Sequence, residues 1–422
     1  VPSAERSADG KINAKDFPGL ARIIIKTTDA SAAAPFGAAN WRDLGRDPDP
    51  TLDAELEART AAVVPTDAAF IMYTSGTTGF PKGVVRNHLF LRNQVDRVRI
   101  LGTTELDIMY NYLPLFHIFG YLDGPMLSMA TGNKQILVET FDPEACLDAV
   151  EAEGVSQFSG FETHMKGLVE AQKRHARDLS SLRIGIFGAG TNSAVPIMRE
   201  GLEVLKPFRP ITAYGMTEIG GNACLSFMDS NDEQICETSG RPCDGFDFRV
   251  IDPDTGQEQP FDVSGEIVLK SYNVMTCYYK KPEETAKAYN ADGWFLTGDM
   301  GYMRADGFLR FLGRYKDMLK IGGENVDPME VEAYLQGHPD VAETAVIGHP
   351  DERLTEVAIA FIAPRPGRTP SEDDILAFCR GKIASFKIPR HIIFISRLPM
   401  TSTGKVRKVD LREQALTTLE NI

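Results

Sequence analysis

The chain has 422 residues, 43% hydrophobic and 25% charged, which is typical of a globular protein too long to form a single compact core. Its 45 basic and 59 acidic residues give a net charge of −14, which argues against a nucleic-acid partner because phosphate backbones need an excess of Lys and Arg. No apolar run could span a bilayer, no secretory signal precedes the fold, and the six cysteines show no CxxC spacing. We therefore expect a cytoplasmic protein of two or more domains with free thiols.

The first half of the chain alternates strands with helices. Buried strands are predicted at 155–161 and 182–187, and helices at 142–153 and 193–205. The first of these helices begins with Asp142 as N-cap and a proline in its first turn. Strands separated by helices indicate a mostly parallel sheet.

From Gly245 onward the pattern changes to strands alone. Apolar side chains alternate with polar ones after this glycine, and further short strands are predicted at 265–270 and 307–312. We expect this part to form a small barrel or sheet packed against the main body.

The last hundred or so residues have the pattern of a separate α+β unit. Helices are predicted to begin at the capping-box patterns Asp327–Glu330 and Thr369–Glu372, and strands to lie at 345–347, 357–362 and 391–395. The predicted fold class is therefore α/β. A large domain at 1–315 has mixed sheets with flanking helices and a small β-barrel at about 240–315, and a smaller α+β C-terminal domain follows at 316–422.

A loop rich in glycine and hydroxyl side chains carries the first chemical signal. Residues 73–84 read Tyr-Thr-Ser-Gly-Thr-Thr-Gly-Phe-Pro-Lys-Gly-Val, which leaves backbone N–H groups and hydroxyls free to surround phosphate oxygens. It is not a Walker loop, because Lys82 is followed by glycine rather than Ser or Thr. The alternative is a flexible surface loop. The predicted nucleotide-binding residues here are Thr74, Ser75, Gly76, Thr77, Thr78, Gly79 and Lys82.

This loop resembles the phosphate loop of the adenylate-forming superfamily, which contains acyl-CoA synthetases, aryl-CoA ligases, luciferases and peptide-synthetase adenylation domains. Four more motifs of that family follow in order, at 213–218, 293–299, 313–317 and 403–405, and they read Ala-Tyr-Gly-Met-Thr-Glu, Gly-Trp-Phe-Leu-Thr-Gly-Asp, Gly-Arg-Tyr-Lys-Asp and Thr-Gly-Lys. The resemblance implies an enzyme that uses ATP and Mg²⁺ to convert a small carboxylic acid to acyl-AMP with release of pyrophosphate. CoA then displaces AMP. Because two anions must meet in the first step, charge neutralisation and positioning carry the catalysis.

The resemblance assigns roles around the nucleotide. Glu218 matches the magnesium-binding glutamate and Thr217 a contact to the α-phosphate, whereas a lone Glu would be read as a surface carboxylate. Asp299 matches the acceptor of both ribose hydroxyls, with Arg314 as its companion; an ion pair that braces the barrel is the alternative. The residues expected around the adenine are Gly188, Ala189, Gly190, Tyr214 and Gly215.

The C-terminal motifs imply two alternating conformations. Lys405 resembles the catalytic lysine that bridges the acid and the α-phosphate, and Lys316 matches the hinge about which the small domain rotates. The rotation would bring the loop with Gly322 and Gly323 to the site of thiol attack. For the acid, the resemblance indicates His117, in Leu-Pro-Leu-Phe-His-Ile-Phe-Gly, and Phe187 is expected in the apolar wall. A wall or core histidine is the alternative for His117.

Several functional alternatives stay open. The acyl group could pass to a carrier protein, the adenylate could be oxidised as in luciferases, or the chain could be a truncated nucleotide-binding fragment. Members of this family carry a substantial subdomain before the glycine loop, and Tyr73 lies too near the start of this chain for it. We therefore expect part of the acyl pocket to be missing. The preferred acid is expected to be an apolar monocarboxylate of medium or greater size, fatty or aryl, and a homodimer is left open.

Overall fold

The computed structural model describes residues 4–6, 12–14, 19–20, 22–26, 38–43, 50–74, 81–188, 194–400 and 406–419. The chain divides into two compact units, residues 1–64 and 65–422. The first unit holds β1 (Ala4–Arg6), β2 (Ile12–Ala14), β3 (Ile24–Ile25), β4 (Ala39–Asn40) and α1 (Asp53–Ala62). The domain boundary expected after residue 315 stays a prediction.

The main sheet of the second unit is mixed, as predicted. Its strand order is β13-β12-β11-β10-β9. Strands β9, β10 and β11 run parallel to one another, whereas β12 pairs antiparallel with both β11 and β13. Gln157 bridges this sheet to the parallel pair β7–β8 through Met109 and Ile184. The strands are β7 (Ile108–Asn111), β8 (Lys134–Leu137), β9 (Gly160–Phe161), β10 (Ile184–Gly188), β11 (Arg209–Met216), β12 (Gly221–Leu225) and β13 (Arg241–Pro242).

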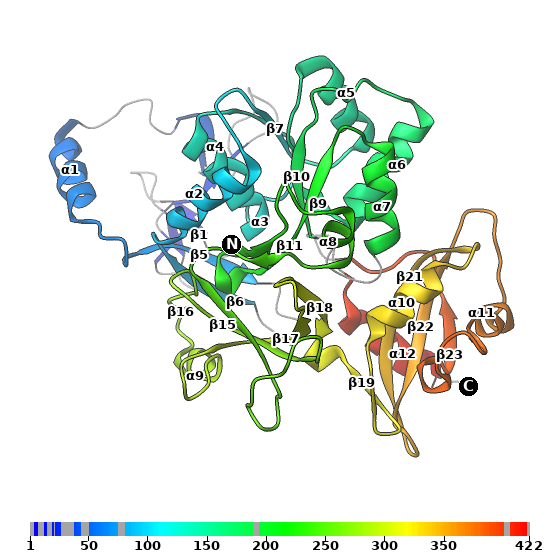
Figure 1. Cartoon of the computed structure of the whole chain (residues 1–422). Helices are drawn as coiled ribbons and strands as arrows, with labels where there is room; N and C mark the ends of the chain where they lie inside the picture. Colours follow the sequence, from blue (N-terminus) through cyan, green and yellow to red (C-terminus); the bar gives the residue numbers. More distant parts are fainter. Residues whose placement is uncertain are drawn as a thin grey trace. The chain divides into compact units, whose positions relative to one another are not determined.

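Helices lie on both sides of β9 and β10. Figure 1 shows α5 (Pro143–Glu153), α6 (Glu162–Arg174) and α7 (Val195–Val204) together on one side. On the other side lie α2 (Phe90–Leu101), α3 (Ile118–Tyr121), the π-helix η4 (Leu122–Met126) and α4 (Leu127–Thr131). Among the described residues, no helix is both long enough and apolar enough to cross a membrane.

Two smaller antiparallel sheets complete the large part. One has the order β16-β6-β5, with β5 (Ala68–Thr74), β6 (Lys82–Asn87) and β16 (Cys277–Tyr278); the other has the order β14-β15-β17-β18. The expected barrel is wrong, because β14 and β18 form no ladder with each other in the described chain. Four short strands have too small a circumference to close around packed side chains, so this sheet packs on the main core instead. Its strands are β14 (Phe246–Ile251), β15 (Gly265–Ser271), β17 (Phe295–Met303) and β18 (Leu309–Arg314), and α8 (Asp232–Glu237) and α9 (Pro282–Lys287) lie between strands in the chain.

The C-terminal part is the predicted α+β arrangement. The hairpin β21–β22 is buried on both faces, which explains its nearly continuous apolar sequence. Val346 and Ala360 pack toward α10 and α11, while Ile347 and Phe361 pack toward α12. The elements are β19 (Leu319–Ile321), β20 (Glu324–Val326), α10 (Pro328–Gln336), β21 (Val341–Asp351), β22 (Thr355–Pro364), α11 (Glu372–Cys379), β23 (His391–Phe394) and α12 (Lys408–Leu419).

Candidate active site

The carboxyl ends of β10 and β11 bring several predicted site residues to one edge of the main sheet. These strands are parallel neighbours, so Gly188 ends one of them close to the end of the other. A side chain at Gly215 would place its Cβ 1.9 Å from the carbonyl oxygen of Gly221, so only glycine lets β11 and β12 approach this closely. Thr217 and Glu218 follow in the short turn η6 (Thr217–Ile219). Ligands of open α/β sheets bind in the crevice at such an edge.

A second group of predicted site residues, Tyr214, Asp299 and Arg314, is centred on the Asp299 carboxylate. Asp299 lies opposite Arg314 in the β17–β18 ladder, and the Arg314 Nε is 3.2 Å from its Oδ1. The Tyr214 hydroxyl donates to Asp299 Oδ2 at 2.8 Å. Burial raises the pKa of Tyr214 well above 10, so this hydroxyl keeps its proton. The cluster therefore joins the end of β11 to the four-stranded sheet.

The Tyr214 ring itself is buried. It lies between Phe248 and Phe311, with ring centroids 6.2 Å and 5.8 Å away. The bond from Tyr214 to Asp299 was not anticipated from the sequence, in which the two residues are 85 positions apart. Adenine stacking by Tyr214 stays a prediction.

Glu218 is linked to the phosphate-loop strand through a tyrosine that the sequence did not single out. The Tyr278 hydroxyl donates to Glu218 Oε1 at 2.9 Å. Burial, followed by the Glu218 carboxylate, raises the pKa of Tyr278, so the phenol remains a donor. The Lys82 ammonium lies 4.6 Å from the centre of the Tyr278 ring, and its Nζ is 3.7 Å from Glu284. Tyr278 is positioned by the pairing of β16 with β6, which has no local sequence signal.

The two ends of the glycine-rich loop are held together by the β5–β6 hairpin. Thr74 pairs with Lys82 in this ladder, and the Thr74 hydroxyl donates to the Lys82 carbonyl at 3.5 Å. Several predicted nucleotide-binding or catalytic residues lie outside the described residues, and their roles stay predictions: Ser75, Gly76, Thr77, Thr78, Gly79, Ala189, Gly190 and Lys405.

An aromatic group connects His117 to the end of β10. His117 is the N-cap of α3, where its Nδ1 accepts from the Phe119 backbone N–H at 3.3 Å. Its ring is 6.2 Å from that of Phe161, and a Cβ at Gly188 would be 3.0 Å from Phe161 Cδ1. Sequence reasoning missed Phe161, which is only partly buried. Phe187 is fully buried against the core, so packing alone accounts for its position, and its substrate role stays a prediction.

The predicted hinge and thiol loop lie at the start of the C-terminal part. Lys316 is in the 3₁₀ turn η7 (Tyr315–Asp317), and its backbone alone is described. Gly322 and Gly323 join β19 to β20 as a two-residue turn with φ values of 61° and 89°, which suits glycine. A cavity of about 290 Å³ beside them is lined by Ile321, Arg380 and Arg390, among others.

Comparison with known proteins identifies the family. The family model described as "AMP-binding enzyme" matches residues 8–279, and the one described as "AMP-binding enzyme C-terminal domain" matches residues 330–405. The chain belongs to the AMP-binding enzyme family. A 7a-methyl-1,5-dioxo-octahydro-1H-inden-4-yl propanoyl:CoA ligase of Rhodococcus jostii is 37% identical, over 94% of this chain and 75% of that protein. The mitochondrial medium-chain acyl-CoA ligase ACSF2 of Bos taurus is 33% identical, over 82% of this chain and 57% of its own length.

Solved structures extend the likeness. The o-succinylbenzoate CoA synthetase MenE of Bacillus subtilis, in complex with ATP and a magnesium ion, matches with a TM-score of 0.73 and 30% identity. The match covers 83% of this chain and 70% of that one.

In this AMP-binding enzyme, the residues that could hold a metal ion are few. Among the described residues, no three His, Cys, Asp or Glu side chains gather as a metal site. Mg²⁺ is commonly bound by one or two carboxylates together with waters and substrate phosphates, so the partly buried Glu218 carboxylate fits such an ion. No cationic side chain of the described residues forms an ion pair with Glu218.

Proposed function

We propose that this chain is an AMP-forming acid–thiol ligase, which uses ATP to activate a carboxylic acid and then transfers the acyl group to CoA. The main support is that two groups of residues lie beside the carboxyl edge of the main sheet. One group is Tyr214, Asp299 and Arg314, and the other is Thr217 and Glu218. That arrangement offers a carboxylate acceptor for a ribose next to a hydroxyl and a carboxylate suited to phosphate and metal. ATP, Mg²⁺ and CoA are the co-substrates and cofactor.

The nucleoside is bound by Asp299, in β17, and by the residues at the end of β10. Asp299 has two oxygens with about four acceptor positions, so it can accept from a vicinal diol while it keeps Tyr214 and Arg314. Gly188, and with it Ala189 and Gly190, borders the adenine at the end of β10.

The first half-reaction joins two anions. An oxygen of the substrate carboxylate attacks the α-phosphorus, the bond from this phosphorus to the bridging oxygen breaks, and pyrophosphate leaves. We assign binding of the leaving phosphates to the loop at 75–79 and Lys82, binding of the α-phosphate to Thr217, and neutralisation of the two reacting anions to Lys405. Magnesium, held by Glu218, supplies charge neutralisation when bound.

The second half-reaction forms the thioester. The CoA thiol loses its proton to water and its sulfur attacks the acyl carbonyl carbon of the adenylate. The bond from this carbon to the phosphate oxygen breaks, and AMP leaves with that oxygen. We assign the domain rotation to Lys316 and the approach of the thiol to the turn at Gly322 and Gly323. The neighbouring cavity, with Arg380 and Arg390 in its lining, supports binding of the phosphates of CoA.

An apolar monocarboxylate of medium or greater size is the proposed acid. His117, Phe119 and Phe161 form a wall of rings, and the acids named for the two relatives are largely apolar. A screen of fatty, aryl and amino acids by pyrophosphate release tests this; preference for a free α-amino acid would contradict it.

The reaction itself is tested by measuring AMP formation with and without CoA. CoA-dependent AMP release with thioester product is expected. Product on a carrier protein alone would favour the first alternative, and oxygen consumption with light would favour a luciferase-like oxidation. We place the enzyme in the cytoplasm, supported by six free cysteines of which all but Cys277 are buried. A homodimer is tested by analytical ultracentrifugation.

A further inference from the structure

Two buried arginines lie directly behind the turn that carries Thr217 and Glu218. Arg86, in β6, is 1% exposed, and Arg97, in α2, is fully buried. Arg86 binds the Glu218 carbonyl within that turn, and Arg97 binds the carbonyls of Gly220, directly after the turn, and of Asn222, in β12. Neither belongs to a recognised motif, and neither was assigned a role from the sequence.

Arg86 fixes the Glu218 residue itself. Its Nη1 donates to the Glu218 carbonyl oxygen at 2.9 Å, and its Nη2 donates to the Asn273 carbonyl at 2.8 Å. The Met275 backbone N–H donates to the same Glu218 carbonyl at 2.6 Å. The Glu218 carbonyl therefore accepts two hydrogen bonds, which fix the peptide group between Glu218 and Ile219.

Arg97 fixes the next residues. Its Nη2 donates to the carbonyls of Gly220, at 2.9 Å, and Asn222, at 3.3 Å. Its Nη1 donates to Asp123 Oδ1 at 3.0 Å, and the Asn222 amide donates to Asp123 Oδ2 at 3.1 Å. The Arg97–Asp123 pair is almost completely buried, so water cannot replace these bonds.

The turn is packed against these side chains without spare room. Gly220 and Gly221 have φ values of 78° and 82°, in the left-handed region that favours glycine. A Cβ at Gly220 would be 2.6 Å from Arg86 Nη2, and a Cβ at Gly221 would be 3.0 Å from Arg97 Nη2. Both glycines are thus explained by their positive φ values and by the close approach of buried side chains, which at Gly220 include the Asn273 amide nitrogen at 2.4 Å from the Cβ.

The two arginines connect the turn to the other parts of the site. Arg86 lies on β6, the strand that leaves the phosphate loop at Lys82. Asp123 lies in η4, directly after the α3 helix that His117 caps. The phosphate loop, the proposed acid wall and the Glu218 turn are therefore joined through charged groups that have fixed donor directions.

We propose that Arg86 and Arg97, with Asp123, are positioning residues for adenylation, because they hold the main chain from Glu218 to Asn222 so that Thr217 and Glu218 face the nucleotide phosphates. This inference rests on the proposed function. A buried ion pair adds little net stability, whereas the planar guanidinium fork holds two carbonyls and a carboxylate in one geometry. Lysine would keep the charge and lose the fork.

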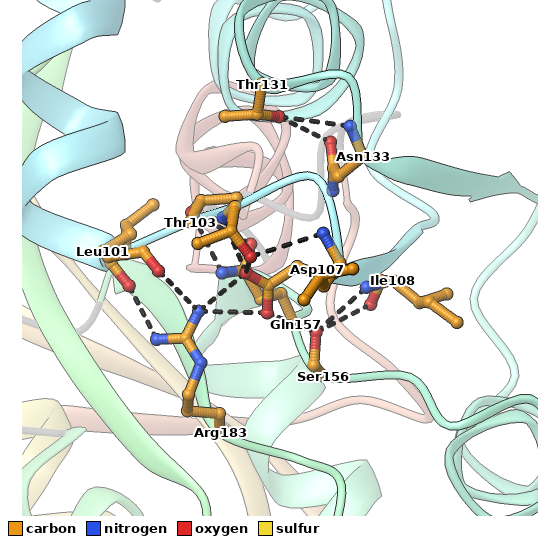
Figure 2. Close-up of polar contacts among 12 residues, drawn as sticks. Leu101, Thr103, Asp107, Ile108, Thr131, Asn133, Ser156, Gln157 and Arg183 are labelled. Atoms are coloured by element: carbon orange, nitrogen blue, oxygen red, sulfur yellow. Dashed lines mark hydrogen bonds and ion pairs between the residues drawn. The ribbon is translucent and has the colours of Figure 1, made fainter.

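A second arginine–aspartate pair, whose arginine side chain is 34% exposed, supplies a control at the opposite edge of the same sheet. Figure 2 shows Arg183, just before β10, donating to the Leu101 carbonyl at 2.7 Å and to Asp107 Oδ1 at 3.0 Å. Asp107 also accepts from the Ser156 hydroxyl at 2.7 Å. This network ties the amino ends of β7 and β10 together, away from the nucleotide crevice.

The experiment compares Arg97→Lys with Arg183→Lys in the full chain at pH 8, after thermal unfolding has confirmed that both are folded. Calorimetry measures the Kd of α,β-methylene-ATP without and with Mg²⁺. The Kd without Mg²⁺ divided by the Kd with Mg²⁺ measures how much the ion strengthens binding. This ratio should fall about tenfold or more in Arg97→Lys, as expected for loss of an outer support of a metal ligand, and stay at the wild-type value in Arg183→Lys. Arg97→Lys should also lose pyrophosphate release yet convert supplied acyl-AMP and CoA to thioester.

Asp123→Asn, which keeps an acceptor oxygen for Arg97, makes the same comparison if Arg97→Lys does not fold. Equal loss of both half-reactions, or a Mg²⁺ ratio equal to that of Arg183→Lys, overturns the proposal. If the wild-type chain forms no acyl-AMP, the proposed function fails, but the calorimetric ratio still decides whether Arg97 positions Glu218.

Discussion

Replacing Asp299 with asparagine should weaken ATP binding through the ribose. Asp299 is 4% exposed, and its carboxylate keeps the Tyr214 hydroxyl at 2.8 Å and the Arg314 Nε at 3.2 Å while further lone pairs remain for the two ribose hydroxyls. A hydrogen bond to a charged group contributes about 1.5–3 kcal/mol, and about 1.4 kcal/mol corresponds to a tenfold change in Kd. We therefore expect the Kd for ATP to rise about 10- to 150-fold.

The assay is a double cycle by calorimetry with ATP and 2′-deoxy-ATP. Wild-type protein should bind the deoxy nucleotide more weakly, and this difference in Kd should become smaller in Asp299→Asn, because asparagine has one neutral acceptor oxygen where aspartate has two charged ones. Asp107→Asn is the control, since it removes a buried carboxylate paired with arginine at the other edge of the sheet. If the 2′-hydroxyl contributes equally in wild-type and Asp299→Asn proteins, Asp299 braces the sheet and does not bind ribose.

Four further outcomes are expected. Glu218→Gln should fold normally but need about tenfold more Mg²⁺ or more for pyrophosphate release; normal activity at low Mg²⁺ would remove Glu218 from the metal site. Lys405→Ala should block adenylation but still turn supplied acyl-AMP and CoA into thioester. Lys316→Pro should keep pyrophosphate exchange and lose thioester formation, because proline fixes φ near −65°; loss of the same half-reaction in both lysine variants would contradict rotation about Lys316. Burial raises the pKa of Asp327, the N-cap of α10, from 3.8 to about 7, so the folded state binds this proton more tightly than the unfolded chain. The free energy of unfolding should therefore fall as the pH rises from about 4 to about 7, and this fall should be smaller in Asp327→Asn than in Asp142→Asn, an exposed N-cap; equal slopes in urea unfolding would contradict the assignment.

Local signals predicted the elements whose ends are set by nearby residues. Asp142 accepts from the backbone N–H groups of Glu144 and Ala145 at the start of α5, as its sequence position indicated. The helix expected from the pattern Thr369–Glu372 is present as α11, but its N-cap is Ser371, in a capping box with Asp374. Both helices are confirmed because a cap needs only residues two or three positions away.

Elements that depend on distant partners were predicted less well. The strand expected at 155–161 is reduced to β9 (Gly160–Phe161), since only Gln157 makes bridges before it. The strands expected at 345–347 and 357–362 extend to Val341–Asp351 and Thr355–Pro364, because each strand's hydrogen-bonding partner continues beyond the apolar run. The barrel was wrong for the same reason: closure depends on whether two edges far apart in the chain pair.

The site divides in the same way. Asp299, Arg314 and Glu218 were indicated by motifs, and the structure brings Asp299 to Arg314 and to Tyr214. Tyr278 and Phe161 carry no motif, and their contacts to Glu218 and His117 span 60 and 44 positions of the chain. Such contacts depend on sheet pairing and packing, which a single sequence does not display.

The two arginine–aspartate pairs show why residue type alone could not have separated function from support. In each pair an arginine nitrogen lies 3.0 Å from an aspartate oxygen and the guanidinium also holds main-chain carbonyls. The carbonyls held by Arg183 belong to the end of α2, at the amino edge of the sheet, where no ligand crevice forms. Those held by Arg97 follow Glu218 by two and four residues, at the carboxyl edge. A shift of about 1 Å in that backbone would carry Glu218 with it, and errors of this size are enough to impair catalysis. The pairs therefore differ in the segment whose backbone each arginine holds, as well as in burial, since the Arg97 side chain is fully buried and the Arg183 side chain is 34% exposed.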